Sequence, residues 1–299
     1  MDATKCEALI VAVESGSFTA AARQLGYTQS GVTRMVASLE SELGFPLCVR
    51  AKQGVRLTEN GRRMLPHLRE LVRAQRVAEE SGAEIRGVLS GALTVGSYYS
   101  ISAIWMPTVL NAFEKDYPGI DVAIREGGNT EMGQWLNSRA VDLCFCAQPS
   151  KGTYCDWIPL YQDEMVMWLP EGHPYATAAS YPIRNLEHEA FIHTLANHDT
   201  DQDRLIREEG LHVQDRYTTT DGFTTYNMVE AGLGVSFNQR LISKCWSGRV
   251  AEVPFEQPRR ISLGIAVPSL AEASPAAQRF VTCIEQLMPR LRRLAGVSA

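Results

Sequence analysis

Residues 17–34 read SFTAAARQLGYTQSGVTR and predict two short helices joined by a tight turn. Ala20–Ala22 are small enough to let the first helix lie close against a neighbour, and Leu25 supplies an apolar contact. Gly26 permits the positive φ with which many helices end. Thr28 suits the N-cap of the next helix, because its hydroxyl can accept a hydrogen bond from a free backbone N–H. The stretch is therefore expected to form a helix-turn-helix.

The second helix of this motif has one apolar and one polar side. Its apolar residues recur at steps of three and four, at Val32, Met35, Val36, Leu39 and Leu43. The opposite side carries short donors and acceptors and one guanidinium, on Gln29, Ser30, Thr33, Arg34 and Ser38. Such groups suit the base edges and phosphates of a DNA major groove. Gln29 and Arg34 are expected to contact base edges, since each can make paired hydrogen bonds.

A hairpin wing and a long helix are predicted after the motif. Two short strands, 48–51 and 55–57, flank Lys52-Gln53-Gly54, and a polar helix follows over about 59–85. The apolar stripe of this helix is expected to meet the same stripe in a second subunit. Four side chains are candidate phosphate contacts: Ser30, Thr33, Arg50 and Lys52. The full set of candidate DNA-binding residues is Thr28, Gln29, Ser30, Thr33, Arg34, Arg50 and Lys52.

Length and charge limit the classes of protein to consider. A chain of 299 residues predicts two or three domains. The formal net charge of −5 argues against a protein that coats polyanions without sequence preference. Acidic and basic residues balance over positions 1–60. Attraction to phosphate must therefore come from the local placement of basic residues in the second helix and the wing.

The seven cysteines predict free thiols in a reducing cytoplasm, because none forms a CxxC pair or a metal-ligand spacing. Residues 2–5 do not resemble a basic and apolar leader, and no apolar run approaches bilayer length. Neither a signal peptide nor a membrane partner is therefore expected. His188, His193 and His198 recur every five residues, a spacing that rotates around a helix, so no metal and no cofactor is expected.

The pattern changes at about position 92. From there strand-like runs alternate with helical segments, the signature of a parallel α/β sheet. Helices are expected over 101–116 and 130–137, and a strand over 164–169. A final amphipathic helix over 276–294 is expected to return to the first α/β unit.

Landmarks along the whole chain point to one family. They are FTAAA at 18–22, TQS at 28–30, Leu43-Gly44, VRLTENG at 55–61, LTVG at 93–96, Tyr117-Pro118, Val141-Asp142-Leu143, His173-Pro174 and MVEAGLGV at 228–235. With these residues the chain resembles the LysR-type transcriptional regulators. The resemblance implies a winged helix, a long linker helix that dimerises, and a two-lobed sensor like a periplasmic binding protein. It also implies assembly as a dimer or tetramer, and a small molecule between the lobes that changes DNA bending.

The expected fold is thus α/β overall, with a mainly α-helical winged helix-turn-helix, a linker helix and a two-lobed α/β sensor. The expected boundaries are 1–58 for the DNA-binding domain, 59–86 for the linker helix, 87–91 for a hinge and 92–299 for the effector-binding domain. Within the last, lobe I is expected at about 92–160 and 268–299, and lobe II at about 161–267.

The effector cleft is expected where strands end and helix N-termini present free N–H groups. Residues 97–100 and 127–130 precede two such helices and resemble the anion-contacting loops of the family. Ser100 and Thr130 are candidates to bind a carboxylate, although the same side chains also suit simple helix capping. The candidate effector-binding residues are Ser97, Ser100, Ile101, Asn129, Thr130, His193 and Thr225.

The ligand is expected to be a small metabolite that is aromatic or carries a carboxylate. The aromatic residues Tyr98, Tyr99, Trp105 and Trp135 indicate an aromatic ligand or an ordinary aromatic core. Asn238-Gln239 stands where the family often has a proline, so no effector contact is assigned there.

These observations favour a ligand-responsive transcription regulator, whose partners are promoter DNA, an effector, further copies of the chain and RNA polymerase. No GxSxG, P-loop, dinucleotide or paired-carboxylate motif supports catalysis, so no catalytic residue is assigned and no enzyme is expected. An enzyme tethered to DNA is the weakest alternative. A thiol-based redox regulator is the other, because Cys144 and Cys146 share one face of a strand and Cys155 is near. An extended strand holds the first two too far apart for an unstrained disulfide.

Overall fold

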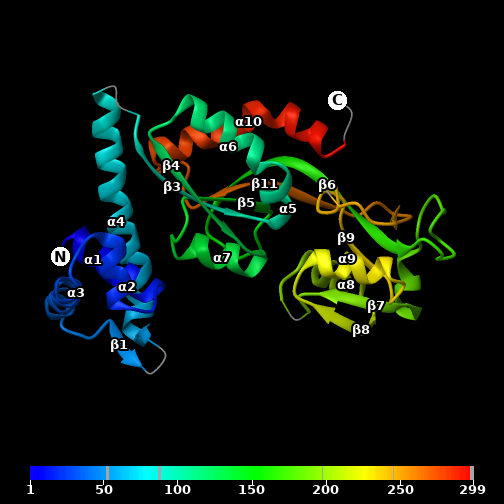
Figure 1. The fold of residues 1–299 in the computed structure, drawn as a ribbon, viewed down its shortest axis with the longest axis horizontal. Helices are drawn as coiled ribbons and strands as arrows, with labels where there is room; N and C mark the ends of the chain where they lie inside the picture. Colours follow the sequence, from blue (N-terminus) through cyan, green and yellow to red (C-terminus); the bar gives the residue numbers. More distant parts are fainter. Residues whose placement is uncertain (52–53, 87–88, 197, 245, 297–299) are drawn as a thin grey trace.

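The computed structural model describes residues 1–51, 54–86, 89–196, 198–244 and 246–296. They form a helical N-terminal unit, one long helix and a two-lobed α/β domain (Figure 1). In chain order the elements are α1 (Ala3–Glu14), α2 (Phe18–Leu25), α3 (Gln29–Leu43), β1 (Cys48–Ala51), β2 (Gly54–Leu57), α4 (Glu59–Ile85), β3 (Gly91–Ser97), α5 (Tyr99–Ile104), α6 (Met106–Asp116), β4 (Ile120–Glu126), α7 (Asn129–Asn137), β5 (Leu143–Ala147), β6 (Asp156–Pro170), the 3₁₀ helix η1 (Ile183–His188), β7 (Ala190–Thr194), α8 (Asp201–Glu209), β8 (Gln214–Thr219), α9 (Gly222–Glu230), β9 (Ser236–Gln239), β10 (Val250–Pro254), β11 (Arg260–Val267) and α10 (Pro275–Leu294).

The helices α1, α2 and α3 pack around a small apolar core. Leu9, Val32 and Leu39 are fully buried in it. Gly26 follows α2 with a φ of 72°, and Thr28 caps α3 with its side-chain oxygen. The helix-turn-helix predicted from residues 17–34 is therefore confirmed, with the turn chemistry that the sequence indicates.

The wing is a two-stranded hairpin held against the helices by polar contacts. Glu40 Oε1 on α3 accepts hydrogen bonds from the backbone N–H groups of Leu47 and Cys48, at 2.6 and 3.0 Å. The N–H of Val55 donates to the carbonyl oxygen of Gly16 across 2.8 Å. The first two bonds hold the start of the wing against α3, and the third holds β2 against the loop between α1 and α2.

The first half of the apolar stripe on α4 packs inside its own subunit. Leu68 is fully buried in the core of the N-terminal unit, and Met64, Leu71 and Val72 pack against that core. The expectation that this part of the stripe meets a second subunit is therefore wrong, because α1 offers an apolar face nearby. At the far end of the helix Ile85 is 87% exposed, although Ala83 is buried and Glu84 pairs with Arg279 of α10.

The two lobes share one mixed sheet in the order β10-β6-β11-β5-β3-β4, to which β9 adds by pairing with β6. Strand β3 is parallel to β4 and β5, but β11 is antiparallel to both β5 and β6. The long strand β6 pairs with β11 and then with β9 and β10, so it passes from one lobe to the other. The parallel arrangement expected from the sequence holds for β3 with β4 and β5, whereas the pairs formed by β6, β9, β10 and β11 are antiparallel. Residues 164–169 form a strand as expected, but this strand begins earlier, at Asp156. The first half of β6 is only partly buried and contains Pro159, a residue that in a sequence argues against a strand interior.

Helices cover both faces of lobe I: α6 and α10 lie on one side of the sheet and α7 on the other (Figure 1). The single helix expected over 101–116 is broken at Trp105 into α5 and α6. The cause is Pro107, whose ring and missing N–H are tolerated only in the first turn of a helix.

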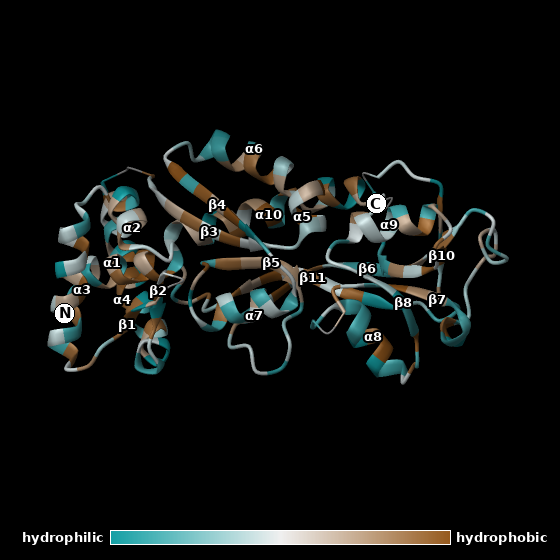
Figure 2. Ribbon diagram, turned by 60° about the horizontal axis from the view of Figure 1, so that its bottom comes forward, coloured by the Kyte–Doolittle hydropathy of each residue, from teal (hydrophilic) through white to brown (hydrophobic). Residues whose placement is uncertain are grey.

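Each lobe has its own apolar core, and in Figure 2 the strands at the centre of lobe I are coloured as hydrophobic. Trp105 and Phe145 are fully buried in lobe I, as Phe191 and Phe237 are in lobe II. No described helix combines the length and apolar character that crossing a bilayer requires.

Candidate functional site

One face of α3 is polar and open to solvent. Gln29, Ser30 and Arg34 are exposed on it, whereas Val32 and Val36 are buried on the opposite side. Arg34 Nε donates to the Ser30 carbonyl oxygen across 3.4 Å, an exposed contact that a DNA group can replace. These three candidate DNA contacts therefore lie together on an accessible helix face.

The remaining DNA-binding candidates are placed in different ways. Thr28 acts as the cap of α3, where its Oγ1 accepts from the Gly31 N–H at 3.1 Å. Thr33 Oγ1 is buried and has no hydrogen-bond partner among the described residues, so it does not present a surface hydroxyl as expected. Arg50 is exposed on β1, and its guanidinium carbon lies 5.0 Å from the centre of the Phe18 ring. Lys52 lies outside the described residues.

A cleft of about 700 Å³ lies between the two lobes. Lobe I contributes the N-terminal ends of α5 and α7 to its wall, and lobe II contributes those of α8 and α9. The cleft is therefore at the strand ends where the sequence places the effector.

Three of the seven candidate effector residues line this cleft, namely Ser100, Asn129 and Thr130. Ser97 and Ile101 are completely buried and are not part of its lining. Ser97 ends β3 inside the sheet, and Ile101 packs into the apolar core of lobe I.

His193 and Thr225 also lie behind the wall. His193 Nδ1 is 3.1 Å from Asp215 Oδ2, and Nε2 is 3.2 Å from Asp203 Oδ1, so two carboxylates hold the ring away from the cleft. The hydroxyl oxygens of Thr225 and Thr194 are 2.7 Å apart. Since Thr194 lines the cleft, Thr225 positions a lining residue and does not itself form the wall.

The cleft also contains a carboxylate that the sequence does not single out. Asp201 begins α8, and its side chain is only 10% exposed. Its oxygens accept hydrogen bonds from Asn129 Nδ2, at 3.3 Å, and from Gln239 Nε2. Burial raises the pKa of Asp201, although these hydrogen bonds oppose the rise. In the sequence this residue looks like an ordinary first-turn acid, and only the packing of lobe I against α8 reveals its role.

Several polar contacts join the lobes beside the cleft. Asn129 donates to Asp201, and Ser100 Oγ lies 3.5 Å from Gln239 Oε1. Ser150 Oγ donates to Asp199 Oδ2 at 3.0 Å and accepts from Arg204 Nη2 at 2.6 Å. Asn238 and Gln239 both line the cleft. The sequence assigns no effector contact to this segment, but β9 ends at the crossing between the lobes and so brings both residues to the cleft.

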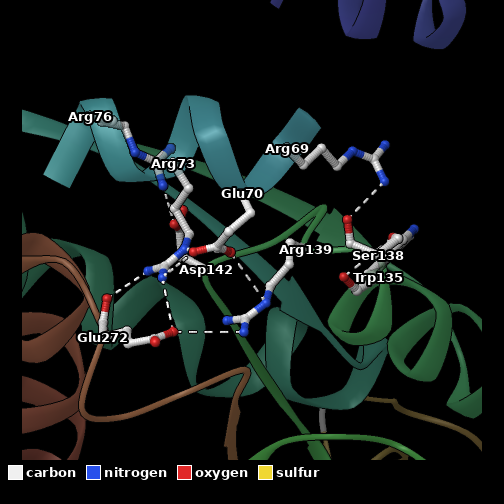
Figure 3. A network of polar contacts seen from close by, with 9 residues as sticks. All are labelled: Arg69, Glu70, Arg73, Arg76, Trp135, Ser138, Arg139, Asp142 and Glu272. Atoms are coloured by element: carbon white, nitrogen blue, oxygen red, sulfur yellow. Dashed lines mark hydrogen bonds and ion pairs between the residues drawn. The ribbon is translucent and has the colours of Figure 1, made fainter. Parts of the chain in front are cut away.

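Polar contacts also connect α4 to lobe I (Figure 3). Arg73 Nη1 donates to the carbonyl oxygen of Glu272 across 2.6 Å. In the opposite direction, Arg139 of lobe I reaches Glu70 of α4, with 3.4 Å between Nε and Oε2. Each of the two parts therefore contributes an arginine to the contact. These side chains fix the linker helix against the loop that precedes α10.

A second group of contacts lies further along α4 in the same view (Figure 3). Arg76 pairs with Asp142, whose other oxygen accepts from the Thr94 N–H at 2.8 Å. The Asp142 side chain is 8% exposed. Because a strand of lobe I and the linker helix share one buried carboxylate, movement of either affects the other.

Comparison with known proteins agrees with this architecture. Residues 4–62 match the model of the bacterial regulatory helix-turn-helix protein, lysR family, and residues 86–289 match that of the LysR substrate binding domain. The HTH-type transcriptional regulator YvbU of Bacillus subtilis is 27% identical over 290 residues, which cover 96% of this chain and 99% of that protein.

A probable hydrogen peroxide-inducible genes activator of Mycobacterium leprae is 27% identical over 94% of this chain and 92% of its own. A full-length OxyR variant from Pseudomonas aeruginosa has a similar fold, with a TM-score of 0.76 at 21% identity over 96% of this chain and 94% of that one. Since the two family models together span most of the sequence, the chain belongs to the LysR family of transcriptional regulators.

Proposed function

We propose that the chain recognises promoter DNA through α3 and the wing, and that a small molecule in the cleft sets its activity. One observation carries the proposal: a single chain joins a helix-turn-helix with an exposed polar face to a two-lobed domain with a cleft of about 700 Å³. The first can enter a major groove, and the second can bind and release a metabolite. The chain then converts metabolite concentration into promoter occupancy.

In this proposal Gln29 and Arg34 contact base edges, and Ser30, Arg50 and Lys52 contact phosphates. The exposure of Gln29, Ser30 and Arg34 on one helix face supports the assignment. Arg50 supports it from the wing, where the Phe18 ring holds its guanidinium. Thr28 contributes by capping the helix that carries the contacts.

We assign positions 1–58 to DNA binding, 59–86 to the linker helix, 87–91 to a hinge and 92–299 to effector binding. The extent of α4 and the start of β3 support the first three boundaries. The pairing of β6 with β11 up to Glu164, and with β9 and β10 beyond it, supports a crossover near position 160. β11 already pairs with β5 of lobe I at 263–266, which supports a return near position 260 in place of 267. A ligand between the lobes favours one orientation of lobe I relative to lobe II. It can shift the balance between two such orientations only if it binds one of them more tightly than the other.

Self-association is proposed through the second half of α4, and the exposure of Ala78 and Ile85 there supports it. Two such helices pair in a dimer, so that two winged helices address the half-sites of an interrupted dyad. Two dimers assemble into a tetramer. The arrangement of the subunits on DNA determines how RNA polymerase engages the promoter. We place this activity in the cytoplasm.

The test uses purified full-length protein and two labelled duplexes, the region upstream of its own gene and a scrambled control. We expect a clear preference for the upstream region at modest salt, and a change in that preference when the effector is present. Substrates of enzymes encoded by flanking genes are the first effectors to screen. Equal binding of both duplexes with every screened metabolite present contradicts the proposal.

The effector is proposed to leave the cleft unchanged, because the lining carries no pattern that the sequence assigns to catalysis. Incubation of effector with protein, followed by mass spectrometry, tests this point. Full recovery of the effector supports a regulator, whereas turnover supports the DNA-tethered enzyme.

A redox-responsive regulator is a second candidate, favoured by the likeness to the peroxide-inducible activator of Mycobacterium leprae. The thiols argue against it. A hydrogen bond with Cys144 and burial raise the pKa of Cys146, and burial raises those of Cys155 and, to about 11, Cys48. Since the thiolate is the reactive form, these thiols react slowly with peroxide. Loss of two hydrogens from a cysteine pair after peroxide treatment, together with altered promoter binding, would support the redox candidate.

A further inference from the structure

The charge of the inter-lobe cleft indicates the chemical class of its ligand. Among the described residues, no lysine or arginine lines the cleft. Its acidic lining residues are Glu126, Glu131, Asp199, Asp201 and Asp221. An excess of one charge in a concave site favours a ligand of the opposite charge.

Carboxylates of this chain lie at three helix N-termini around the cleft, those of α7, α8 and α9. Glu131 Oε2 accepts from the Gly128 N–H at 3.0 Å at the start of α7, and Asp221 Oδ1 accepts from the Thr224 N–H at 2.8 Å at the start of α9. Asp201 lies in the first turn of α8. Free N–H groups and the positive end of the helix dipole are what an anionic ligand would use. At the starts of α7 and α9 acids of this chain accept from backbone N–H groups, whereas at α8 the cap is Thr200 and α5 has no side-chain cap.

The negative charge is only partly compensated behind the wall. Arg204 pairs with Asp199 through Nε at 3.0 Å and Nη2 at 2.7 Å, and its Nη1 lies 4.0 Å from Asp201 Oδ1. One guanidinium therefore offsets one carboxylate. Glu126 is exposed and forms no ion pair with any described residue. The cleft keeps a net negative charge available to a ligand.

A buried hydroxyl supplies a second and independent observation. Tyr98 lines the cleft and is 7% exposed, yet its hydroxyl has no hydrogen-bond partner among the described residues. Asp201 and Arg204 are close enough to influence this hydroxyl electrostatically. A buried polar group without a partner is costly, so the position is suited to a ligand that supplies one. A ligand N–H can donate to the Tyr98 oxygen and to the nearby Asp201 carboxylate.

Two aromatic rings, one from each lobe, complete the lining. Tyr99 is 51% exposed and Phe223 is 50% exposed, and both belong to the cleft wall. Ring faces attract cations as well as apolar groups. Leu195 and Ile242 add aliphatic surface. The site thus offers apolar contact beside its carboxylates.

We propose that the effector is an organic cation, an amine or guanidine with an apolar body. The proposal rests on the cleft being the effector site. The charged nitrogen lies among Asp201, Glu126 and the Tyr98 hydroxyl, and the apolar body lies between Tyr99 and Phe223. A bare metal ion does not fit, since no group of three or more His, Cys, Asp or Glu in the described ranges could hold one. The carboxylate-bearing ligand expected from the resemblance is disfavoured.

Calorimetry on the full-length protein tests the charge class with matched pairs of probes. 2-Phenylethylamine is compared with 3-phenylpropionate, agmatine with adipate, and magnesium chloride serves as the simple cation. We expect each amine or guanidine to bind at least about tenfold more tightly than its carboxylate partner, with affinity falling as salt rises. Tighter binding of the carboxylates, binding of magnesium alone, or no binding by either cationic probe overturns the proposal.

Variants locate the binding. Asp201→Asn is expected to weaken amine binding by about tenfold, and Glu126→Gln and Tyr98→Phe by about threefold each. Asp121→Asn is the matched control, because Asp121 is exposed on β4 and is not part of the cleft lining. It is expected to leave the affinity within about twofold. Equal amine binding by wild type, Asp201→Asn and Glu126→Gln contradicts the assignment.

Promoter binding measured on the same preparations separates this proposal from the proposed function. If the upstream duplex is preferred while carboxylates bind the cleft in place of amines, the ligand class is wrong and the regulator stands. If neither duplex is preferred, the regulator itself fails, whichever probe binds.

Discussion

Arg125 in β4 contacts Glu14 at the end of α1, with 3.4 Å between Nη2 and Oε2. The other oxygen of Glu14 accepts from Arg69 Nη2 on α4 at 2.7 Å. The residue after Arg125 is Glu126, which lines the cleft. The ligand-binding lobe therefore touches the DNA-binding unit through the residue next to its own ligand site.

Replacing Glu14 by Gln is expected to loosen this junction with little loss of stability. The free energy of unfolding should fall by no more than about 1 kcal/mol, because the pairs are partly exposed. The distribution of distances between fluorescent labels on α3 and α6 should broaden, because Arg69 and Arg125 lose a shared charge. Single-molecule energy transfer measures the distribution. Glu7→Gln, an exposed change on the same helix, is the control, and equal widths for the two variants would refute the coupling.

Arg34→Ala should weaken binding to the specific promoter site by about 1–3 kcal/mol, and binding to random DNA by less. The reason is that a guanidinium on the exposed face of α3 can make paired hydrogen bonds to one base. Fluorescence anisotropy at fixed salt measures both affinities. Arg249→Ala, with a side chain 79% exposed on lobe II, controls for the loss of one positive charge. An equal loss on both duplexes would assign Arg34 to the DNA backbone.

Gly61 and Gly82 lie in the same helix but tolerate a methyl group differently. A Cβ on Gly61 would collide with the backbone carbonyl oxygen of Leu47, so Gly61→Ala should destabilise the N-terminal unit by about 1–3 kcal/mol. A Cβ on Gly82 would meet its nearest atom, in the Arg86 side chain, at 3.7 Å. Gly82→Ala should therefore stabilise α4 by about 0.5–1 kcal/mol. Denaturant unfolding compares the two, and a larger loss at Gly82 would contradict the packing described.

Asp163 makes stability depend on pH. The side chain is 1% exposed, and burial raises its pKa from an ordinary 3.8 to about 7, against the hydrogen bonds that the Leu241 and Glu164 N–H groups donate. Between these values the folded chain holds one more proton than the unfolded chain, so stability falls as pH rises. Asp163→Asn should remove up to about 1 kcal/mol per pH unit of that slope between about pH 4 and pH 7.

Urea unfolding at several pH values measures this slope for wild type and variant. Asp121→Asn, an exposed change of the same chemistry, should keep the wild-type slope. Parallel stability curves for wild type and Asp163→Asn would show that another group titrates in this range.

The N-terminal unit is predictable from local sequence because its signals act within a few residues. The N-cap at Thr28, the left-handed Gly26 and the three- and four-residue apolar steps of α3 all reappear in the structure. The extent of α4 is likewise predicted within one residue. Which surface its apolar stripe covers is not predictable, because the partner of Leu68 lies far away in the sequence, in α1.

The cleft shows the limit of local patterns. Its place at the start of α5 and α7 follows from the alternation of strands and helices, and Ser100, Asn129 and Thr130 are found there. His193 fails as a lining residue because Asp203 and Asp215, close in space, hold its ring.

Helix periodicity and capping decide the DNA-binding motif within a few residues, so the order of amino acids suffices for that part of the protein. The acidic character of the ligand site depends on Glu126, Asp201 and Asp221, which come from different elements and both lobes. Long strands that cross between the lobes bring these side chains together. Burial and charge at such a meeting point are properties of the folded arrangement, because they arise from residues that are neighbours only in space.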